Sequence, residues 1–87
     1  MPTPRGALSV TEYDGKLYAV GGYDRKINTA AVEVYDPEHN TWVESAPLPT
    51  PRDHLAAATV SGKVYAIGGR LNGDYGRNLS VTEVYDP

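Results

Sequence analysis

The chain alternates short apolar runs with clusters of turn residues about every ten positions, and it lacks the periodicity of an amphipathic helix. This pattern predicts one strand at residues 7–13 and another at 17–21, joined by a hairpin turn at Asp14-Gly15. Asp-Gly is a favoured two-residue turn because both of its positions accept a positive φ. Five further strands are predicted at 31–35, 41–45, 54–60, 64–68 and 81–85. The pattern therefore predicts an all-β fold of seven short antiparallel strands.

The sequence also contains an internal repeat. Residues 2–22 match residues 49–69 at 11 of 21 positions, with an offset of 47. Residues 28–37 then match residues 78–87 at 6 of 10 positions, with an offset of 50. The offset changes because one segment has five residues in the first copy and eight in the second. Since loops vary in length while packed strands do not, the pattern predicts two copies of one supersecondary unit.

Each unit has a glycine pair at the end of its second strand and a tyrosine at the end of its third strand, and the first unit adds a tryptophan. These residues are Gly21-Gly22, Tyr35 and Trp42 in the first unit, and Gly68-Gly69 and Tyr85 in the second. The pattern resembles the kelch repeat, which forms one blade of a β-propeller. The resemblance implies two four-stranded antiparallel kelch-type blades, at 1–48 and 49–87, as part of a β-propeller. The second blade is expected to lack its outer strand.

Length, composition and charge restrict the function. A chain of 87 residues is too short for a two-domain enzyme, and the absence of cysteine excludes disulfides and thiolate metal sites. The formal net charge of -3 argues against nucleic acid and membrane surfaces as partners. No apolar run approaches the roughly 20 residues that span a bilayer, and no signal peptide pattern is present. We therefore expect a cytoplasmic location.

Residue types that often carry catalysis or bind metal have structural interpretations here. Asp36 and Glu38 follow a strand in a turn, where an aspartate hydrogen-bonds the backbone. His39 and His54 are expected at opposite ends of a blade, too far apart to share a metal ion. The glycine pairs open no helix, so they lack the helix N-terminus that binds phosphate. We expect no cofactor, no metal ion and no catalysis, and we expect Trp42 to be buried by neighbouring blade residues.

The basic residues are concentrated in one set of connections. Strands of a blade alternate in direction, so the connections between the second and third strands open on the same face as those between blades. Six of the eight basic residues lie in these connections: Arg5, Arg25, Lys26, Arg52, Arg70 and Arg77. Arg5 and Arg52 also repeat in register, each shortly before an inner strand. An acidic protein is thus predicted to present one basic loop face.

The kelch resemblance implies a non-catalytic scaffold that binds a protein or peptide on this face. In the substrate-adaptor branch of the family, arginines before the inner strand or after the glycine pair hold acidic side chains. Arginine suits this task because its planar guanidinium can bind a carboxylate through two hydrogen bonds. Position nominates the ligand-binding residues Arg5, Arg52, Arg70, Asn72 and Tyr23, of which Tyr23 is equivalent to Arg70. An acidic peptide is the expected ligand.

An enzymatic alternative also follows from the resemblance. Sugar mutarotases or epimerases of this fold place polar groups at the mouth of the central channel, and Arg52, His54 and Glu12 are candidates for such a site. The copper oxidases of the fold need a cysteine, which this chain lacks. A titration with sugars or copper separates the two classes.

The number of units raises the question of assembly. Two neighbouring blades cover only the faces that they share, so two outer faces are expected to be bare. We expect the chain to complete a propeller, either within a longer chain or by self-association. Three chains that form six blades match the usual size of a kelch propeller, and such a homo-oligomer closes through one head-to-tail interface.

Overall fold

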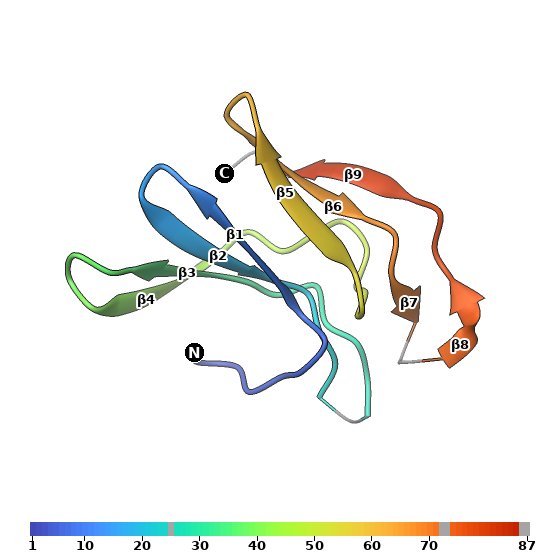
Figure 1. The fold of residues 1–87 in the computed structure, drawn as a ribbon. Coiled ribbons are helices and arrows are strands. Elements are labelled where there is room, and N and C mark those ends of the chain that lie inside the picture. The colour runs from blue at the N-terminus through green and yellow to red at the C-terminus, as the bar shows by residue number, and fades with distance from the viewer. Residues whose placement is uncertain (25, 72–73, 86–87) are drawn as a thin grey trace.

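The computed structural model describes residues 1–24, 26–71 and 74–85, and for residues 74–77 it describes the backbone alone. These residues form strands and turns, and among them no helix is long and apolar enough to cross a membrane. Two antiparallel sheets lie side by side (Figure 1). Blade 1 contains, in this order, β1 (Ser9–Tyr13), β2 (Lys16–Val20), β3 (Val32–Asp36) and β4 (Thr41–Ser45). Blade 2 contains, in this order, β5 (Ala56–Val60), β6 (Lys63–Ile67) and β9 (Thr82–Tyr85).

The predicted all-β fold is confirmed, with a four-stranded blade followed by a three-stranded one. The β1–β2 turn has φ values of 53° at Asp14 and 77° at Gly15. The β5–β6 turn repeats them, with 50° at Ser61 and 78° at Gly62. Both central residues therefore have a positive φ, as the Asp-Gly sequence predicted for the first hairpin.

Both inner strands, β1 and β5, begin later than predicted, and for the same reason. Each follows a non-glycine residue with a φ of 53°, which is Ala7 in blade 1 and His54 in blade 2. A positive φ interrupts the extended conformation, and alanine and histidine rarely adopt it, so the sequence gives no sign of it. The His54 N–H donates a 2.8 Å hydrogen bond to the Ala7 carbonyl, which joins the entrances of the two inner strands.

The longer of the two variable segments contains a short hairpin that the sequence analysis missed. Strands β7 (Arg70–Leu71) and β8 (Asp74–Asn78) pair antiparallel there, as a small separate sheet. The sequence did contain a signal, because Asn72-Gly73 between two short runs is a common hairpin dipeptide. The first unit has no such dipeptide in its shorter segment.

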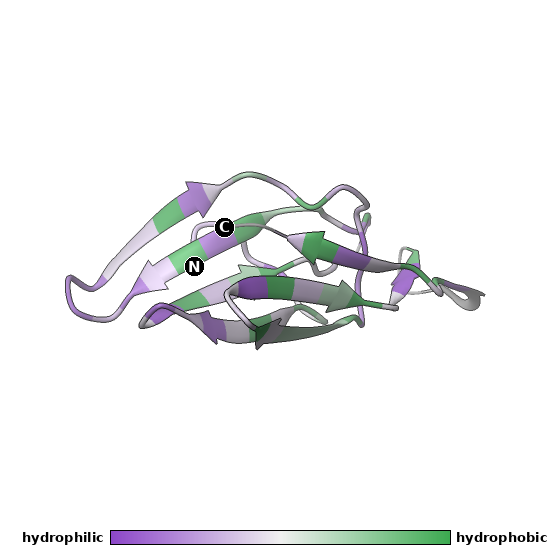
Figure 2. Ribbon diagram, turned by 90° about the horizontal axis from the view of Figure 1, so that it is seen from above, coloured by the Kyte–Doolittle hydropathy of each residue, from purple (hydrophilic) through white to green (hydrophobic). Residues whose placement is uncertain are grey.

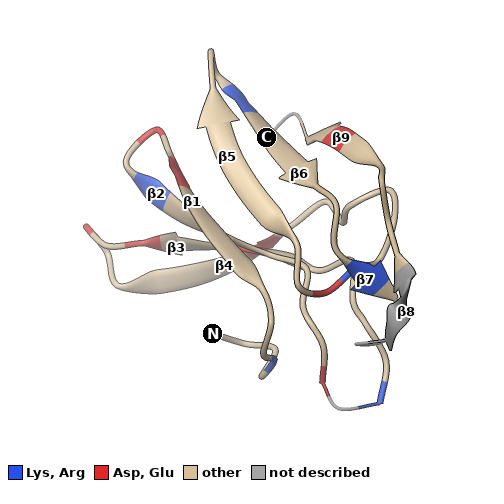
Figure 3. Cartoon of the chain, turned by 45° about the vertical axis from the view of Figure 1, so that its right-hand side comes forward, with Lys and Arg blue, Asp and Glu red and all other residues tan. Residues whose placement is uncertain are grey.

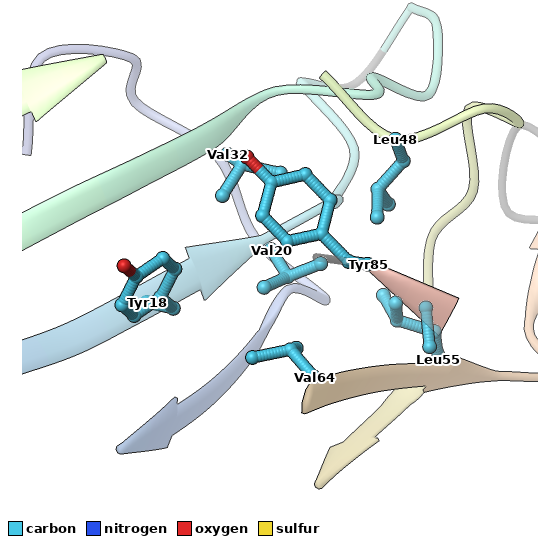
Figure 4. Packing of buried hydrophobic residues seen from close by; sticks show 8 residues of the cluster. Tyr18, Val20, Val32, Leu48, Leu55, Val64 and Tyr85 are labelled. Atoms are coloured by element: carbon cyan, nitrogen blue, oxygen red, sulfur yellow. The ribbon is translucent and has the colours of Figure 1, made fainter. Parts of the chain in front are cut away.

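The hydrophobic core lies between the two blades. Strand alternation gives each sheet two faces, and one face of blade 1 packs against one face of blade 2. The buried cluster consists of Tyr18, Val20, Val32, Leu48, Leu55, Val64, Ala66 and Tyr85 (Figure 4). Members come from both sheets and from the connection between them, so the two blades stabilise each other through this shared core.

Polar contacts fix how the blades sit on each other. Thr11 on β1 and Thr59 on β5 hydrogen-bond through their hydroxyls at 2.8 Å, because these inner strands are neighbours (Figure 1). Farther out, the Tyr85 hydroxyl donates to the Ala46 carbonyl at 2.6 Å and lies 2.7 Å from the Ser45 hydroxyl. The adjacency of β1 and β5 agrees with the prediction that they are the innermost strands.

Trp42 is partly buried, and the aromatic neighbour that covers it belongs to its own blade. Its neighbour is Tyr35 on β3, with ring centroids 5.1 Å apart, on the face of blade 1 that points away from blade 2. We therefore expect Trp42→Ala to lower the free energy of unfolding by only about 1–2 kcal/mol, the loss of one aromatic pair and part of one side chain's burial. Urea unfolding followed by circular dichroism measures this, and a loss above about 3 kcal/mol contradicts it.

Candidate functional site

The connections gather at two opposite ends of the blades. The β1–β2, β3–β4 and β5–β6 turns lie at one end, and the β2–β3 connection, the β4–β5 connection and the β7–β8 hairpin lie at the other (Figure 1). We call the second of these the loop end. The predicted grouping of the connections is therefore confirmed, and Arg5, Tyr23, Arg52 and Arg70 belong to segments at this end.

The Arg5 side chain points into blade 1 and is completely buried. Its Nη2 donates to Glu33 Oε1 at 3.1 Å and to the Ala19 carbonyl at 3.0 Å. Its Nη1 donates to the carbonyls of Gly21 and, at 2.9 Å, Ala31. Arg5 thus ties the ends of β2 and β3 together and forms an ion pair with a glutamate that is itself buried.

Arg52 repeats this arrangement in blade 2. Its side chain is also completely buried, and its Nη2 donates to Glu83 Oε1. Its Nη1 donates to the carbonyls of Gly68 and Val81, each at 3.0 Å. A threonine completes each network: Thr3 donates to Glu33 Oε2 and Thr50 to Glu83 Oε2, both at 2.7 Å. The two blades therefore contain the same threonine, arginine and glutamate network.

The prediction that the side chains of Arg5 and Arg52 bind a ligand needs correction. Both guanidinium groups have no exposed area, and they bind glutamates and backbone carbonyls inside their blades. A ligand at the loop end meets neither charge, because reaching it requires breaking a buried ion pair. The sequence did contain a signal for this role. Glu33 and Glu83 each interrupt an apolar strand at the same repeat position, and a buried carboxylate needs a cationic partner.

Burial by itself raises the pKa of the Glu33 carboxyl. Hydrogen bonds from Thr3 and the charge of Arg5 outweigh burial, so this pKa lies below its ordinary value of 4.5. A carboxyl whose pKa is lowered on folding stabilises the protein above its unfolded pKa. That contribution is lost as the pH falls from about 4.5 through the folded pKa.

We therefore expect the urea midpoint of unfolding to fall as the pH drops below about 5. Glu33→Gln removes the carboxyl, so this variant should be less stable at neutral pH and should lose less on acidification. Urea titrations of both proteins across this range measure the effect. Parallel pH profiles for the two proteins contradict the assignment of the acid sensitivity to Glu33.

These ion pairs change the charge of the loop end. Two of its six basic residues are neutralised inside the blades, and of the other four the structure describes the side chains of Lys26 and Arg70 (Figure 3). Arg25 and Asn72 lie outside the described residues, as does the side chain of Arg77. The exposed Asp24 lies on the same end, and its pKa is lowered by hydrogen bonds from the backbone N–H groups of Ile27 and Lys26. The described loop end is therefore much less basic than predicted.

Tyr23 and Arg70 occupy equivalent places, as predicted. Tyr23 pairs with Gly6 through two backbone hydrogen bonds of 3.0 and 2.9 Å. Arg70 pairs in the same way with Asp53, at 3.1 and 2.7 Å. Gly6 and Asp53 are themselves repeat equivalents. Each residue thus follows a glycine pair at the end of the second strand of its blade. Its backbone pairs with the segment that leads into the inner strand of the same blade.

A pocket of about 560 Å³ lies at the loop end of blade 1. It is lined by Pro4, Arg5, Gly6, Ala7, Tyr23 and Asp24. The Arg5 guanidinium is buried and exposes no area to the pocket. A ligand in the pocket can therefore contact the backbone of residues 4–7, the partly exposed Tyr23 and the Asp24 carboxylate. Among the described residues that were predicted to bind a ligand, Tyr23 is the one that lines this pocket with a partly exposed side chain.

The structure does not bring together the residues of the enzymatic alternative. The Glu12 carboxylate accepts a 2.8 Å hydrogen bond from the Gly15 N–H, at the end of blade 1 opposite to the loop end. His54 lies at the loop end, where its Nδ1 is 2.7 Å from the buried Asp53 carboxylate. Arg52 is buried against Glu83. The three side chains therefore have separate structural partners.

Asp36, Glu38 and His39 form a small acidic group in the β3–β4 turn. The Asp36 carboxylate accepts a 3.0 Å hydrogen bond from the Glu38 N–H and lies 2.9 Å from His39 Nδ1. The hydrogen bond with His39 is the main cause that lowers the pKa of Asp36. The prediction that Asp36 serves the backbone of the turn is therefore confirmed.

Comparison with known proteins identifies the repeat. The Kelch motif family matches residues 4–49 and 51–87. Kelch-like protein 4 from Homo sapiens is 42% identical over 48 residues, which cover 55% of this chain and 7% of that protein. Kelch-like protein 6 from Homo sapiens is 53% identical over 34 residues, which cover 39% of this chain and 6% of that protein.

A third relative has a more specific name. The Influenza virus NS1A-binding protein homolog of Mus musculus is 42% identical over 48 residues, which cover 55% of this chain and 8% of that protein. The chain therefore spans less than a tenth of the length of each of these three relatives.

Proposed function

Because the chain belongs to the kelch-repeat family, we propose that it is a non-catalytic protein-binding module that receives a segment of its partner at the loop end. The pocket beside Tyr23 carries this proposal. Its volume of about 560 Å³ accommodates one or two side chains of a partner protein. A relative named as a binding protein for another protein supports the same class of function.

The pocket has the chemistry of a protein-binding site. Tyrosine supplies a rigid apolar ring and a hydroxyl, and such residues carry much of the binding energy at protein interfaces. The backbone of residues 4–7 beside it is held by the Gly6–Tyr23 bridge and by the buried Arg5 guanidinium. The binding surface is therefore fixed before the partner arrives, which reduces the entropic cost of association.

We also propose, as a finer statement, that the partner segment is acidic. Lys26 and Arg70 support this preference among the described side chains, whereas Arg5 and Arg52 do not contribute to it. Asp24 opposes it locally, so the acidic residue of the ligand belongs on the Arg70 side of the loop end and not in the pocket.

A finer proposal concerns assembly. We propose that the two blades are part of a complete propeller, which forms by self-association of this chain or with further blades of a longer chain. Exposed apolar side chains on both sheets support this, because contiguous apolar patches are uncommon on isolated soluble domains.

Fluorescence anisotropy of a labelled glutamate-rich peptide and of its glutamine counterpart tests the binding proposal. We expect the glutamate peptide to bind more tightly, and to weaken as the salt concentration rises. Arg70→Ala should lower the affinity for the glutamate peptide by roughly tenfold or more, since a charged hydrogen bond is worth about 1.5–3 kcal/mol. The affinity for the glutamine peptide should change little. Tyr23→Ala should weaken both peptides.

Lys63→Ala is the control, because Lys63 is an exposed basic residue beside the β5–β6 turn, at the opposite end of the blades. This variant should bind both peptides as the unmodified chain does. Equal losses for Lys63→Ala and Arg70→Ala show that the attraction is nonspecific and reject the acidic preference. Unchanged binding in Tyr23→Ala rejects the pocket as the binding site.

A further inference from the structure

Each blade has an apolar face that the other blade does not cover. On blade 1 this face carries the apolar Val10, Leu17, Tyr35 and Trp42, the buried Ala19, and three glutamates, Glu12, Glu33 and Glu44. On blade 2 it carries Ala58, Val60, Tyr65, Ile67 and Val84. Figure 2 shows hydrophobic positions along the strands of both sheets. We call these surfaces the blade 1 outer face and the blade 2 outer face.

The internal repeat relates these two outer faces to the interface inside the chain. The blade 1 outer face is equivalent to the face of blade 2 that packs on blade 1, so Leu17 corresponds to Val64. Leu17 is 40% exposed, whereas Val64 is 0% exposed. The blade 2 outer face is equivalent to the face of blade 1 that packs on blade 2, so Ile67 corresponds to Val20. Ile67 is 44% exposed, whereas Val20 is 1% exposed.

We propose that the blade 2 outer face of one chain binds the blade 1 outer face of a second copy, by repeating the contact that joins the two blades within a chain. This inference deepens the self-association proposed above and rests on it. The residues at the core of the internal interface keep their apolar character at the new one. Val20, Tyr18 and Val34 correspond to Ile67, Tyr65 and Val84, and Val64, Ala66, Tyr85 and Leu55 correspond to Leu17, Ala19, Tyr35 and Leu8.

The backbone at the glycine pairs supports the same docking. Within the chain, the Gly22 N–H donates a 2.8 Å hydrogen bond to the Arg52 carbonyl. A Cβ on Gly21 would lie 2.7 Å from that same carbonyl oxygen, so the connection passes directly over the glycine. A Cβ on the equivalent Gly68 would meet only the Leu79 carbonyl, at 3.5 Å, among the described residues. The space over Gly68 is therefore open for an equivalent connection.

The segment that fits this space is the entry to blade 1 of a second copy. Residues 2–5 repeat 49–52 without a change, so the second copy offers the Arg5 carbonyl to the Gly69 N–H as Arg52 offers its carbonyl to Gly22. The Ala7 N–H of the second copy would likewise donate to the His54 carbonyl of the first. This bond is the equivalent of the internal one from the His54 N–H to the Ala7 carbonyl. The new interface would thus have both the apolar core and the backbone hydrogen bonds of the internal one.

The new interface differs from the internal one at several places, and these differences weaken it. The buried Leu48, and the Ser45 hydroxyl and Ala46 carbonyl that contact Tyr85, have no counterpart in the second unit of this sequence. Thr11 and Thr59, which hydrogen-bond at 2.8 Å within the chain, correspond to Ala58 and Glu12. The buried Val32 corresponds to the exposed Thr82. Contact between copies is therefore weaker than contact between the blades of one chain, so assembly depends on protein concentration.

The contact is head-to-tail, because two different faces meet. Such contacts form closed rings when the rotation from one copy to the next completes a circle. Propellers close with about four to eight blades, so two, three or four copies meet this condition, and six blades from three copies lie in the middle of the range.

Sedimentation equilibrium of the full chain tests the proposal, with Trp42 as an internal reporter. Trp42 is the sole tryptophan and lies on the blade 1 outer face. We expect an average mass that rises with concentration towards three times 9.4 kDa, and tryptophan emission that shifts to shorter wavelength as the mass rises. A mass that stays at the monomer over the micromolar range, whether the chain is folded or unfolded, overturns the proposal.

Two charged variants test the head-to-tail geometry. Leu17→Asp disables the blade 1 outer face and Ile67→Asp disables the blade 2 outer face, and each alone should remain monomeric. An equal mixture should form a dimer and nothing larger, because the two intact faces are complementary. Val43→Asp is the matched control: Val43 is 61% exposed but lies on neither outer face, so this variant should assemble normally.

The outcomes separate this inference from the binding proposal. A mixture that stays monomeric, or a Leu17→Asp chain that still dimerises alone, rejects the head-to-tail contact. Circular dichroism must show that each variant keeps its strand signal. An unfolded variant shows that the face stabilises the blade and not an assembly, and this result also counts against the proposal. Arg5 and Ala7 take part in the new contact and also line the pocket beside Tyr23. Peptide binding is therefore measured on the monomeric Leu17→Asp and Ile67→Asp chains, where its loss rejects the binding proposal and leaves the assembly test unaffected.

Discussion

Arg52→Ala is expected to lower the free energy of unfolding by about 3–5 kcal/mol, because it leaves Glu83 without its buried cationic partner. The Gly68 and Val81 carbonyls lose their donor in the same step. A domain of this size is stable by only about 5–15 kcal/mol, so the variant should lose a large fraction of its stability. Urea unfolding monitored by circular dichroism measures the loss.

Two further variants show whether the ion pair causes this loss. Lys63→Ala removes an exposed basic residue and should change the free energy of unfolding by no more than about 0.5 kcal/mol. Arg52→Met combined with Glu83→Leu removes both charges and fills their space, and it should recover much of the stability. A stable Arg52→Ala chain with reduced peptide affinity contradicts the structural role and supports the original prediction that Arg52 binds ligand.

Gly21→Ala is expected to destabilise the chain by about 2–4 kcal/mol. Gly21 has a φ of 68°, which costs alanine conformational energy, and the new Cβ would lie 2.7 Å from the Arg52 carbonyl oxygen and 2.9 Å from Leu55 Cδ2. The clash is with backbone, so the β4–β5 connection must move and the two blades must separate slightly. The melting temperature and the urea midpoint should both fall.

Gly68→Ala is the matched control for this prediction. Its φ is 65° and its nearest contact is at 3.5 Å, so it carries the conformational cost without the clash. At concentrations where the chain is monomeric, it should lose only about 1–2 kcal/mol. Equal losses at the two positions contradict the close approach of the β4–β5 connection to Gly21.

The strands could be predicted from the sequence because their determinants are local. The Asp14-Gly15 turn fixes one hairpin by itself, and the repeat then transfers the same boundaries to blade 2. The starts of β1 and β5 could not be predicted in this way. They depend on a positive φ at Ala7 and His54, which the residue types disfavour and which tertiary contacts impose.

The candidate site was less predictable because it depends on contacts that are distant in sequence. A loop arginine can point to solvent or into its sheet, and for Arg5 the deciding partner is 28 residues away, at Glu33. Arg5 lies before β1 and Glu33 lies on β3, and the two repeat with different offsets, so position alone did not connect them. Tyr23 was placed more successfully, since its position relative to the glycine pair fixes its backbone partner Gly6.

The repeated threonine, arginine and glutamate network has a consequence for the history of such chains. Each blade contains its own copy of this arginine and glutamate pair, so the charge of the network sums to zero without help from a neighbour. A gene duplication that adds one blade therefore brings the buried arginine together with its matching glutamate. Divergence can then concentrate in the segment after the glycine pair, which already differs between five and eight residues.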